Sequence, residues 1–488
     1  MPDGYACVRV DSRGAGRSPG LLDPFSRRET QDLYECIEWA AAQPWSTGKV
    51  GLNGISYYAM NQWHVAALHP PHLAAMCVWE GAADFYRDGT HHGGILSSSF
   101  WANWYDKQVT AVQHGVGEKG PRHPVTGETV AGPETLTSAE LAAARVPFAE
   151  EIRSHPLDDE FHRARSADWG QITVPFLTAA NWGGQGLHTR GNFEGFTQAA
   201  APRKWLEVHG LEHWTHFYTD YGVDLQKRFF ACFLHGDDSG WRDQPPVRLQ
   251  VRRLDGFTQR AEQEWPLART VWRRLYLRPD SGELSEAAGA GQEHLSYRAD
   301  GDGVTFTAPP AERETEITGP VAARLFVSST AADADLFCVL RLLRPGGREV
   351  TFPGAIDPNT PVAQGWLRLS HRKLDPELST PYRPYHSHDE IQPLIPGEIY
   401  QADVEIWPTS VVVPPGYQVA LTIRGRDYEV RRPGAPRLGT FKNEMTGSGP
   451  FLHDDPVDRP PDLTASTQTL WHGPGQESYL LLPVIPGG

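Results

Sequence analysis

The chain has 488 residues, 39% of them hydrophobic and 22% charged, which indicates a globular protein of two or three domains. Its net charge of −15 argues against a nucleic-acid partner, because phosphate binding needs a basic surface. No apolar run approaches the ~20 residues of a membrane span, so no membrane partner is expected. The five cysteines are widely spaced and form no CxxC pair, which favours a cytoplasmic protein over a disulfide framework.

The first part of the chain alternates strand-like and helix-like segments. Leu33, Ile37 and Ala40 recur at helical spacing and give one apolar face to a helix expected at 29–43, which Pro44 ends. Strands are expected at 5–11, 49–53 and 73–79, and a second helix at 59–67. This alternation predicts βαβ units and a parallel sheet.

An insertion interrupts this pattern at about residues 88–170. The segment is polar and aromatic, contains a helical run at 138–151, and is expected to form a mostly helical cap. The sheet pattern then resumes with strands at 174–180 and 204–209 and a helix at 225–234. The sequence therefore predicts an α/β domain over residues 1–243.

The character of the chain changes after Gln244-Pro245-Pro246. Short strands without helices are expected at 247–251, 322–327, 337–343, 417–423 and 478–484. Regular short strands separated by turn residues are typical of a β-sandwich or jelly roll. A second, all-β domain is therefore predicted over residues 244–488.

The main chemical signal is Ser56, in Gly54-Ile55-Ser56-Tyr57-Tyr58, between a predicted strand and a predicted helix. A nucleophile elbow has this strand–turn–helix context, which exposes the serine hydroxyl at the carboxyl edge of the sheet. The helix N-terminus offers free N–H groups and a positive dipole end to a developing oxyanion. The pattern favours a catalytic Ser56 over the alternative, a serine that caps a helix.

His213 is the expected general base, because it follows the predicted strand at 204–209 on a loop. In an α/β hydrolase the histidine comes after the serine and the acid in chain order. His209, His213 and His216 have spacings that a metal site could also use. This stretch is strand and loop without a carboxylate at metal-ligand spacing, so a metal-dependent hydrolase is the weaker hypothesis.

At these residues the chain resembles the CocE/NonD hydrolases, the family of bacterial cocaine esterase and the X-prolyl dipeptidyl peptidases. The similarity extends over essentially the whole chain. Four stretches carry it: Gly4 to Asp11 with Arg13 to Ser18; Pro44-Trp45-Ser46 to Ser56-Tyr57; Trp79-Glu80-Gly81 to Asp84 and Asp88; and Gly365 to Arg368 with Ser370-His371-Arg372. Pro396-Gly397-Glu398 and Trp407-Pro408-Thr409 also resemble the β domain of that family.

The resemblance implies an α/β-hydrolase domain with a helical cap, a C-terminal jelly-roll domain, and a Ser-His-Asp triad without metal or other cofactor. Carried over by position, Ser56 is the nucleophile and His213 the base. The backbone N–H of Tyr57 is one oxyanion donor. The substrate class implied is a small-molecule ester, an amide or a short peptide.

Two departures from the family pattern concern the site. Ala59 replaces the last Gly of G-x-S-Y-x-G, which is the smallest possible change. The family acid lies two positions after a tryptophan that corresponds to Trp182, and Gly184 occupies that position here. Without a carboxylate the histidine loses orientation and stabilisation of its charged form. We expect Glu80 to supply the acid from the end of the strand at 73–79, with Asp84 as the other candidate.

A third departure concerns the start of the chain. The first predicted strand resembles the family strand that directly precedes the nucleophile's βα unit. The family's earlier strands, and the loop with the tyrosine that is the second oxyanion donor, have no counterpart here. We expect the true start to lie upstream of Met1.

The sequence leaves several functional alternatives open. Esterase or acylase chemistry competes with X-Pro dipeptidyl cleavage, for which a group that holds the substrate amine is not identifiable. A non-catalytic relative, with a jelly roll that serves binding or homo-oligomer contacts, is the alternative from another class. Trp101, Trp104 and Tyr105 are expected to form the core of the cap rather than to line an acyl pocket.

Overall fold

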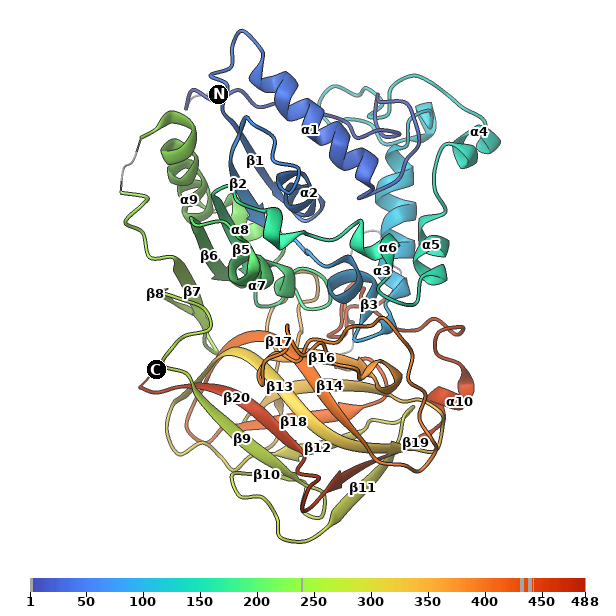
Figure 1. Cartoon of the computed structure of the whole chain (residues 1–488), viewed down its shortest axis with the longest axis vertical. Helices are drawn as coiled ribbons and strands as arrows, with labels where there is room; N and C mark the ends of the chain where they lie inside the picture. Colours follow the sequence, from blue (N-terminus) through green and yellow to red (C-terminus); the bar gives the residue numbers. More distant parts are fainter. Residues whose placement is uncertain (1–2, 238–239, 431–433, 438–440, 442, 488) are drawn as a thin grey trace.

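The computed structural model describes residues 3–237, 240–430, 434–437, 441 and 443–487. An α/β part and a β part lie one above the other along the long axis of the molecule (Figure 1). Among the described helices, none has the length and apolar character that crossing a lipid bilayer requires.

A six-stranded sheet forms the centre of the α/β part, in the order β1-β2-β5-β6-β7-β8. Its strands are β1 (Val50–Ile55), β2 (Leu73–Trp79), β5 (Phe176–Asn181), β6 (Lys204–His209), β7 (Val247–Arg252) and β8 (Phe257–Glu262). The pairs from β1 to β7 are parallel, and β8 pairs antiparallel with β7. The predicted parallel sheet is therefore confirmed.

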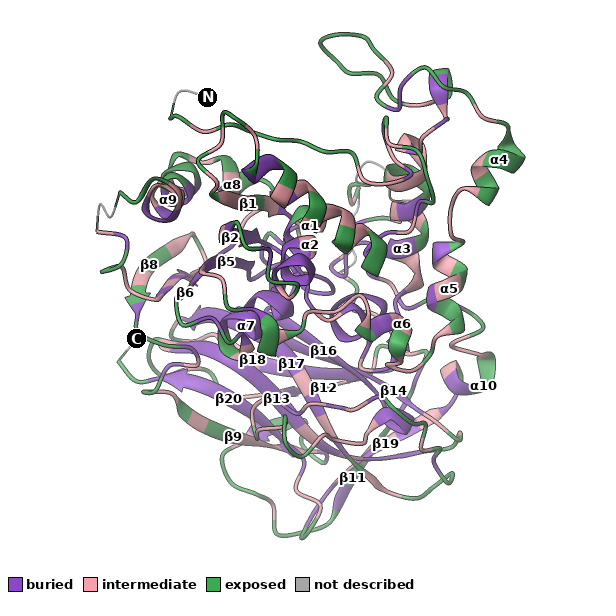
Figure 2. Ribbon diagram, turned by 45° about the horizontal axis from the view of Figure 1, so that its top comes forward, coloured by how far each residue is buried: buried purple, intermediate pink, exposed green. Residues whose placement is uncertain are grey.

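Helices cover both faces of this sheet, as the alternation of buried side chains along β2 requires. Met76 and Val78 pack with α1 (Arg27–Ala41) and α2 (Tyr57–Ala66). Cys77 and Trp79 point to the other face, which packs against α9 (Asp220–Phe230). Other helices beside the sheet are α7 (Thr189–Gln198), α8 (Thr215–Tyr218) and the irregular helix η6 (Ala231–His235). Figure 2 shows β2, β5 and α2 as a buried centre, with exposed residues on the outer side of α1.

The segment between β2 and β5 combines short helices with turns and irregular stretches. It contains the hairpin of β3 (His91–His92) and β4 (Ile95–Leu96), the irregular helices η1 (Phe85–Thr90), η2 (Tyr105–Val109), η3 (Thr110–Val112), η4 (Gly117–Lys119) and η5 (Trp169–Gln171), and the helices α3 (Ser98–Trp104), α4 (Ser138–Ala143), α5 (Phe148–Ser154) and α6 (Glu160–Arg163). The prediction of one helix over residues 138–151 is wrong, because the structure has two short helices there, α4 and α5. Pro147 separates α4 from α5, because proline lacks an N–H and disfavours a helical residue before it.

Two other expectations differ from the structure. Residues 5–11 form no strand in the described structure, and Val8 and Val10 are exposed. The strand expected at 247–251 does form, as β7, but it pairs with β6 in the α/β sheet. The sheet of the first domain thus continues beyond residue 243, where the sequence predicted the boundary.

The β part is built on one large sheet that closes on itself. Its order is β11-β19-β13-β17-β16-β14-β18-β12-β10-β9-β20, and β20 also pairs with β13. Its strands are β9 (Val271–Arg278), β10 (Glu283–Ser285), β11 (Glu293–Arg298), β12 (Val304–Thr307), β13 (Thr315–Ser329), β14 (Asp335–Leu343), β15 (Glu349–Val350), β16 (Ala363–Arg368), β17 (Tyr400–Val413), β18 (Gln418–Arg424), β19 (Thr467–His472) and β20 (Tyr479–Ile485). Alternate side chains point inward and form one apolar core.

The β part lies directly against the loops that follow β5 and β6. The Ala355 N–H donates to the Gly183 carbonyl at 3.0 Å, and the His213 N–H donates to the Ala355 carbonyl at 2.9 Å. These loops stand at the carboxyl ends of parallel strands, where α/β proteins place their functional groups. The β part therefore helps to fix the loops that carry the candidate site.

Candidate active site

Ser56 lies at the turn between β1 and α2. Its backbone has φ 60° and ψ −116°, a strained conformation for a residue with a side chain. Its N–H donates to the Trp79 carbonyl at 3.0 Å. A Cβ on Gly54 would lie 2.4 Å from the Tyr58 Cβ, so the turn requires glycine there. Ser56 makes no capping hydrogen bond with its side chain, contrary to the helix-cap alternative.

The backbone N–H of Tyr57 lies at the first position of α2, directly after Ser56. The first N–H groups of a helix have no partner within it and carry its positive dipole end. Ala59, two positions further on, is fully buried and contacts the loop of Gly81. The small residue at 59 thus allows α2 to pack closely on the loop that follows β2.

His213 and Glu80 form a hydrogen-bonded pair. Nδ1 of His213 lies 2.7 Å from Oε2 of Glu80, and both side chains are buried. Glu80 directly follows β2 and has φ 48°, and His213 is on the loop after β6. The structure therefore places a carboxylate against the predicted base, although Gly184 occupies the usual acid position.

Three donors surround the Glu80 carboxylate. Besides His213, the amide Nδ2 of Asn181 lies 3.2 Å and Nε2 of His209 lies 3.1 Å from Oε1 of Glu80. Burial alone would raise the pKa of Glu80, but His213 and His209 hold it well below its ordinary value. Glu80 is therefore a carboxylate throughout the neutral pH range.

The hydrogen-bonded chain continues away from Ser56. Nδ1 of His209 lies 2.6 Å from Glu207, and the other oxygen of Glu207 lies 3.5 Å from Nε2 of His216. Burial would lower the pKa of His209, but Glu207 and Glu80 raise it to about 9. His209 is thus an imidazolium between two carboxylates at neutral pH.

The metal hypothesis for His209, His213 and His216 needs a correction. The structure divides these residues between two clusters: Glu80, His188 and His213 form one, and Glu207, His209 and His216 the other. The carboxylates that the local sequence lacked come from β6 and from the end of β2. A hydrogen bond lies within each cluster, at 2.7 Å between Glu80 and His213 and at 2.6 Å between Glu207 and His209, and a third, at 3.1 Å between His209 and Glu80, joins the two clusters.

His188 is the residue that the sequence did not reveal. Its Nε2 lies 2.9 Å from Oγ of Ser56, and its ring stacks on that of His213 with centroids 4.7 Å apart. It stands at the N-terminus of α7, at the end of the loop after β5. Its place on a loop at the carboxyl edge of the sheet is the signal that could have found it.

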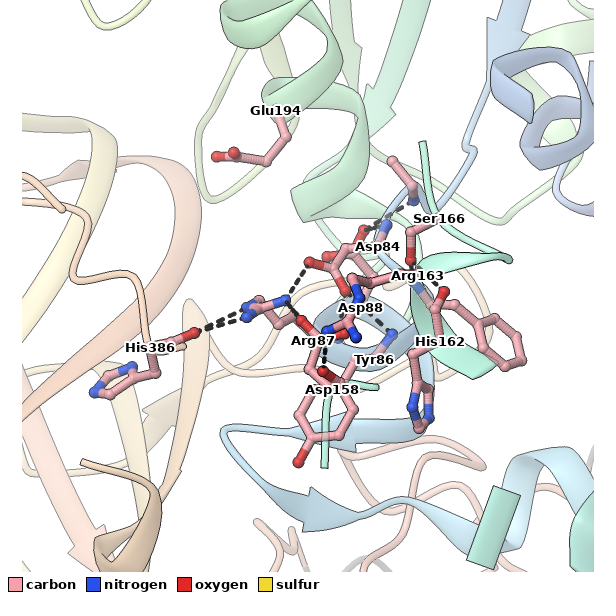
Figure 3. A network of polar contacts seen from close by, with 12 residues as sticks. Asp84, Tyr86, Arg87, Asp88, Asp158, His162, Arg163, Ser166, Glu194 and His386 are labelled. Carbon is pink, nitrogen blue, oxygen red and sulfur yellow. Dashed lines mark hydrogen bonds and ion pairs between the residues drawn. The ribbon is translucent and has the colours of Figure 1, made fainter. Parts of the chain in front are cut away.

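Asp84 lies in a different network and does not contact Ser56 or His213. It caps η1 by accepting from the Tyr86 and Arg87 N–H groups, and Nη1 of Arg87 lies 2.8 Å from its other oxygen. Arg87 also bonds to Asp158 of the cap and to the His386 carbonyl of the β part (Figure 3). Asp84 therefore holds the cap and the β part together, and its proposed role as the triad acid is not supported.

The aromatic residues Trp101, Trp104 and Tyr105 belong to or pack against one buried cluster. Trp101 and Tyr105 are buried, and each donates to a backbone carbonyl, as expected for core residues. Trp104 is half-buried and stacks on Tyr57 with centroids 5.8 Å apart. Trp104 also contacts the rings of Phe25 and Trp101, so it packs at the edge of the same aromatic core.

Comparisons with known proteins agree with this arrangement. A model of the X-Pro dipeptidyl-peptidase (S15 family) matches residues 1–218, and one of the X-Pro dipeptidyl-peptidase C-terminal non-catalytic domain matches residues 239–481. The solved structure of a CocE/NonD family hydrolase from Staphylococcus aureus is 32% identical, with a TM-score of 0.85, and the match covers 97% of this chain and 78% of that one.

Two curated relatives match with lower identity. Cocaine esterase of Rhodococcus sp. (strain MB1 Bresler) is 24% identical over 99% of this chain and 88% of its own length. A putative serine esterase of Mycobacterium bovis is 25% identical over 92% of this chain and 83% of its own length. Together with the match to the staphylococcal hydrolase, these similarities show that the chain belongs to the CocE/NonD family of serine hydrolases.

Proposed function

We propose that the protein hydrolyses an ester or amide through an acyl-enzyme on Ser56, with His213 as general base and Glu80 as the triad acid. The observation that carries this proposal is the 2.7 Å contact between Glu80 and His213 beside the strained elbow of Ser56. A buried carboxylate on Nδ1 fixes the tautomer and the orientation of the base.

The reaction follows from these positions. Glu80 holds Nδ1–H of His213, so Nε2 takes the proton of Ser56 as Oγ attacks the substrate carbonyl. The Tyr57 N–H donates to the oxyanion of the tetrahedral intermediate. His213 then gives the proton to the leaving group, and water repeats the sequence to release the acid and restore Ser56.

An ester or acylated amine fits the site better than an X-Pro peptide. Glu29 is the carboxyl group that contacts Tyr57, and it accepts from the Tyr57 hydroxyl and from the Phe25 N–H. These bonds occupy the group that would otherwise be placed to hold a substrate amine. The stacked rings of Tyr57, Trp104 and Phe25 form an apolar wall beside the helix that follows Ser56, which favours an apolar substrate group.

The role of the β part is a supporting one in this proposal. We propose that its closed sheet is a jelly roll, which fixes the loops of Gly183 and His213 through Ala355. All five cysteines are free, which favours a reducing compartment such as the cytoplasm. The non-catalytic alternative loses its main ground, because Glu80 offers the carboxylate that position 184 lacks.

The test is labelling with a fluorophosphonate probe, with Ser56→Ala as the matched control. We expect labelling of the wild type and none of the variant, together with Ser56-dependent hydrolysis of 4-nitrophenyl butyrate. Full turnover in the Ser56→Ala variant would refute the proposal. Faster cleavage of an X-Pro 4-nitroanilide than of the ester would instead identify a dipeptidyl peptidase, and loss of activity with a chelator would favour the metal hypothesis.

A further inference from the structure

His188 is the side chain in contact with the proposed nucleophile, and the roles of base, acid and backbone oxyanion donor leave it without a function. Its Nε2 lies 2.9 Å from Oγ of Ser56, a normal hydrogen-bond distance. The side chain is only 2% exposed, so this contact is formed away from bulk water. A buried imidazole directly on the reacting oxygen must affect the chemistry there.

The position of His188 is fixed by its surroundings. The His188 N–H donates to the Gly184 carbonyl at 3.0 Å, and the Thr189 hydroxyl donates to the Asn181 carbonyl at 2.6 Å. The ring stacks on His213 at an interplanar angle of 29°. A Cβ on Gly184 would lie 3.5 Å from the His188 Cβ. The residue thus stands beside the position at which the family usually has its acid.

His188 is poorly suited to be the general base. Burial and the neighbouring His213 lower its pKa to about 3, so it stays neutral at any working pH. An effective base has a pKa near the working pH and is oriented by a third group. Among the described residues, the carboxylate at this site hydrogen-bonds to the ring of His213 and not to that of His188.

A neutral imidazole carries one N–H and can donate it without a change of charge. This use of a neutral histidine is known for enzymes that stabilise negative charge on oxygen. If Nε2 of His188 bears the proton, it donates to a lone pair of Ser56 Oγ and leaves the Ser56 proton free for His213.

We propose that His188 is a second catalytic histidine, which remains neutral and donates its Nε2–H to Ser56 Oγ while His213 moves the proton. This inference rests on the proposed function. During acylation the Ser56 proton passes to His213, the bond from Oγ to the acyl carbon forms, and the bond to the leaving group breaks as His213 protonates it. During deacylation a water molecule gives a proton to His213 as its oxygen bonds to the acyl carbon, and the bond from the acyl carbon to Oγ breaks as His213 returns that proton to Oγ. His188 keeps its own proton in both halves and stabilises the partial negative charge that develops on Oγ in the transition states.

Three substitutions of His188 test this role, because they differ in where the side chain can place a hydrogen-bond donor. In His188→Gln the side-chain amide reaches the place of Nε2, whereas in His188→Asn it reaches only the place of Nδ1, and His188→Ala has no donor. We expect the Asn and Ala variants to lose about 10²- to 10³-fold in kcat for 4-nitrophenyl butyrate, with little change in KM. The Gln variant should remain within about tenfold of the wild type. Thermal unfolding of each variant shows whether it is folded.

The pH profile separates the possible outcomes. We expect the acid limb of kcat/KM to stay in place in the His188 variants, because a neutral residue does not titrate there. If the Gln variant is as impaired as the Ala variant and the acid limb disappears, His188 is the base and the inference is wrong. Equal losses in all three variants with an unchanged limb, or no loss in any, would also overturn it. Turnover that survives Ser56→Ala would refute the proposed function itself, which keeps the two failures distinct.

Discussion

Oε2 of Glu80 lies 2.7 Å from Nδ1 of His213, although 133 residues separate the two in the chain. Glu80 directly follows β2 and His213 follows β6, and β5 lies between these strands in the sheet. In the proposed mechanism the triad acid thus comes from the end of an earlier strand than position 184, which follows β5. The pair is the basis of the first prediction.

Glu80→Gln should lower kcat by about 10⁴-fold, because an amide on Nδ1 no longer selects the tautomer that leaves Nε2 free to accept a proton. KM for 4-nitrophenyl butyrate should change little. Steady-state kinetics and the rate of fluorophosphonate labelling measure the effect. Thermal unfolding must accompany them, since the substitution also removes a buried partner of His209.

Asp84→Asn is the matched control, because it alters a buried carboxylate four residues away. Asp84 bonds to Arg87 and not to the site, so this variant should keep kcat and lose stability. If kcat falls in Asp84→Asn and is retained in Glu80→Gln, the assignment of the acid is reversed. Retention of kcat in both would mean that neither carboxylate is the triad acid.

The imidazolium of His209 predicts a pH-dependent stability. Its pKa is about 9 in the folded protein and about 6.5 in an unfolded chain, so the folded state binds the extra proton between these values. The stabilisation is fully present below pH ~6.5 and is lost as the pH rises through about 9. Urea unfolding at pH 6, 7.5 and 9 should show a falling free energy of unfolding.

His209→Gln serves as the control for this effect. Its free energy of unfolding should be lower than that of the wild type at pH 6, and it should vary less between pH 6 and 9 because glutamine does not titrate. Parallel curves for the wild type and the variant would show that His209 is not the group responsible.

The parts of this site that were predictable from sequence are those with a local pattern. Ser56 stands in a strand–turn–helix motif, and Glu80 and His213 each follow an apolar strand, so their places were recognisable. Their pairing depends on strand order, which local patterns do not contain. His188 was missed because its contact with Ser56 depends on the path of a loop. Residues 5–11 have an apolar strand composition, but a strand also needs a neighbour, and the composition does not indicate one.

The boundary between the two parts shows the same limit. Residues 247–251 were correctly predicted as a strand, yet they pair with β6 rather than with the β part. Strand propensity describes a half-buried extended segment and does not say which sheet it joins. The contacts that tie the two parts together are likewise long-range, and they lead to the third prediction.

Arg190→Met should lower the free energy of unfolding by about 3–5 kcal/mol, because it leaves the buried carboxylate of Asp88 without its charged partner. The Arg190 side chain is 2% exposed, and it bonds to Asp88 at 3.0 Å and to Glu405 of β17 at 3.0 Å. Urea unfolding measures the change. Arg298→Ala, which breaks the exposed pair with Asp300, should leave the midpoint near that of the wild type. Equal effects of the two substitutions would contradict the argument.

The contact between Ala59 and Gly81 joins the helix of the nucleophile to the loop of the acid, so the two residues should be coupled. A Cβ on Gly81 would lie 2.8 Å from the Ala59 Cβ and 2.9 Å from Cγ1 of Val78. Gly81→Ala should therefore cost about 1–3 kcal/mol of stability and lower kcat by displacing Glu80 or α2.

Ala59→Gly alone should cost about 1 kcal/mol, since glycine weakens a helix. The double variant removes the clash with residue 59 but not the one with Val78, so it should recover part of the stability and of kcat. A double-mutant cycle by urea unfolding and steady-state kinetics measures this coupling, and strictly additive losses would show that the contact does not link the two catalytic loops.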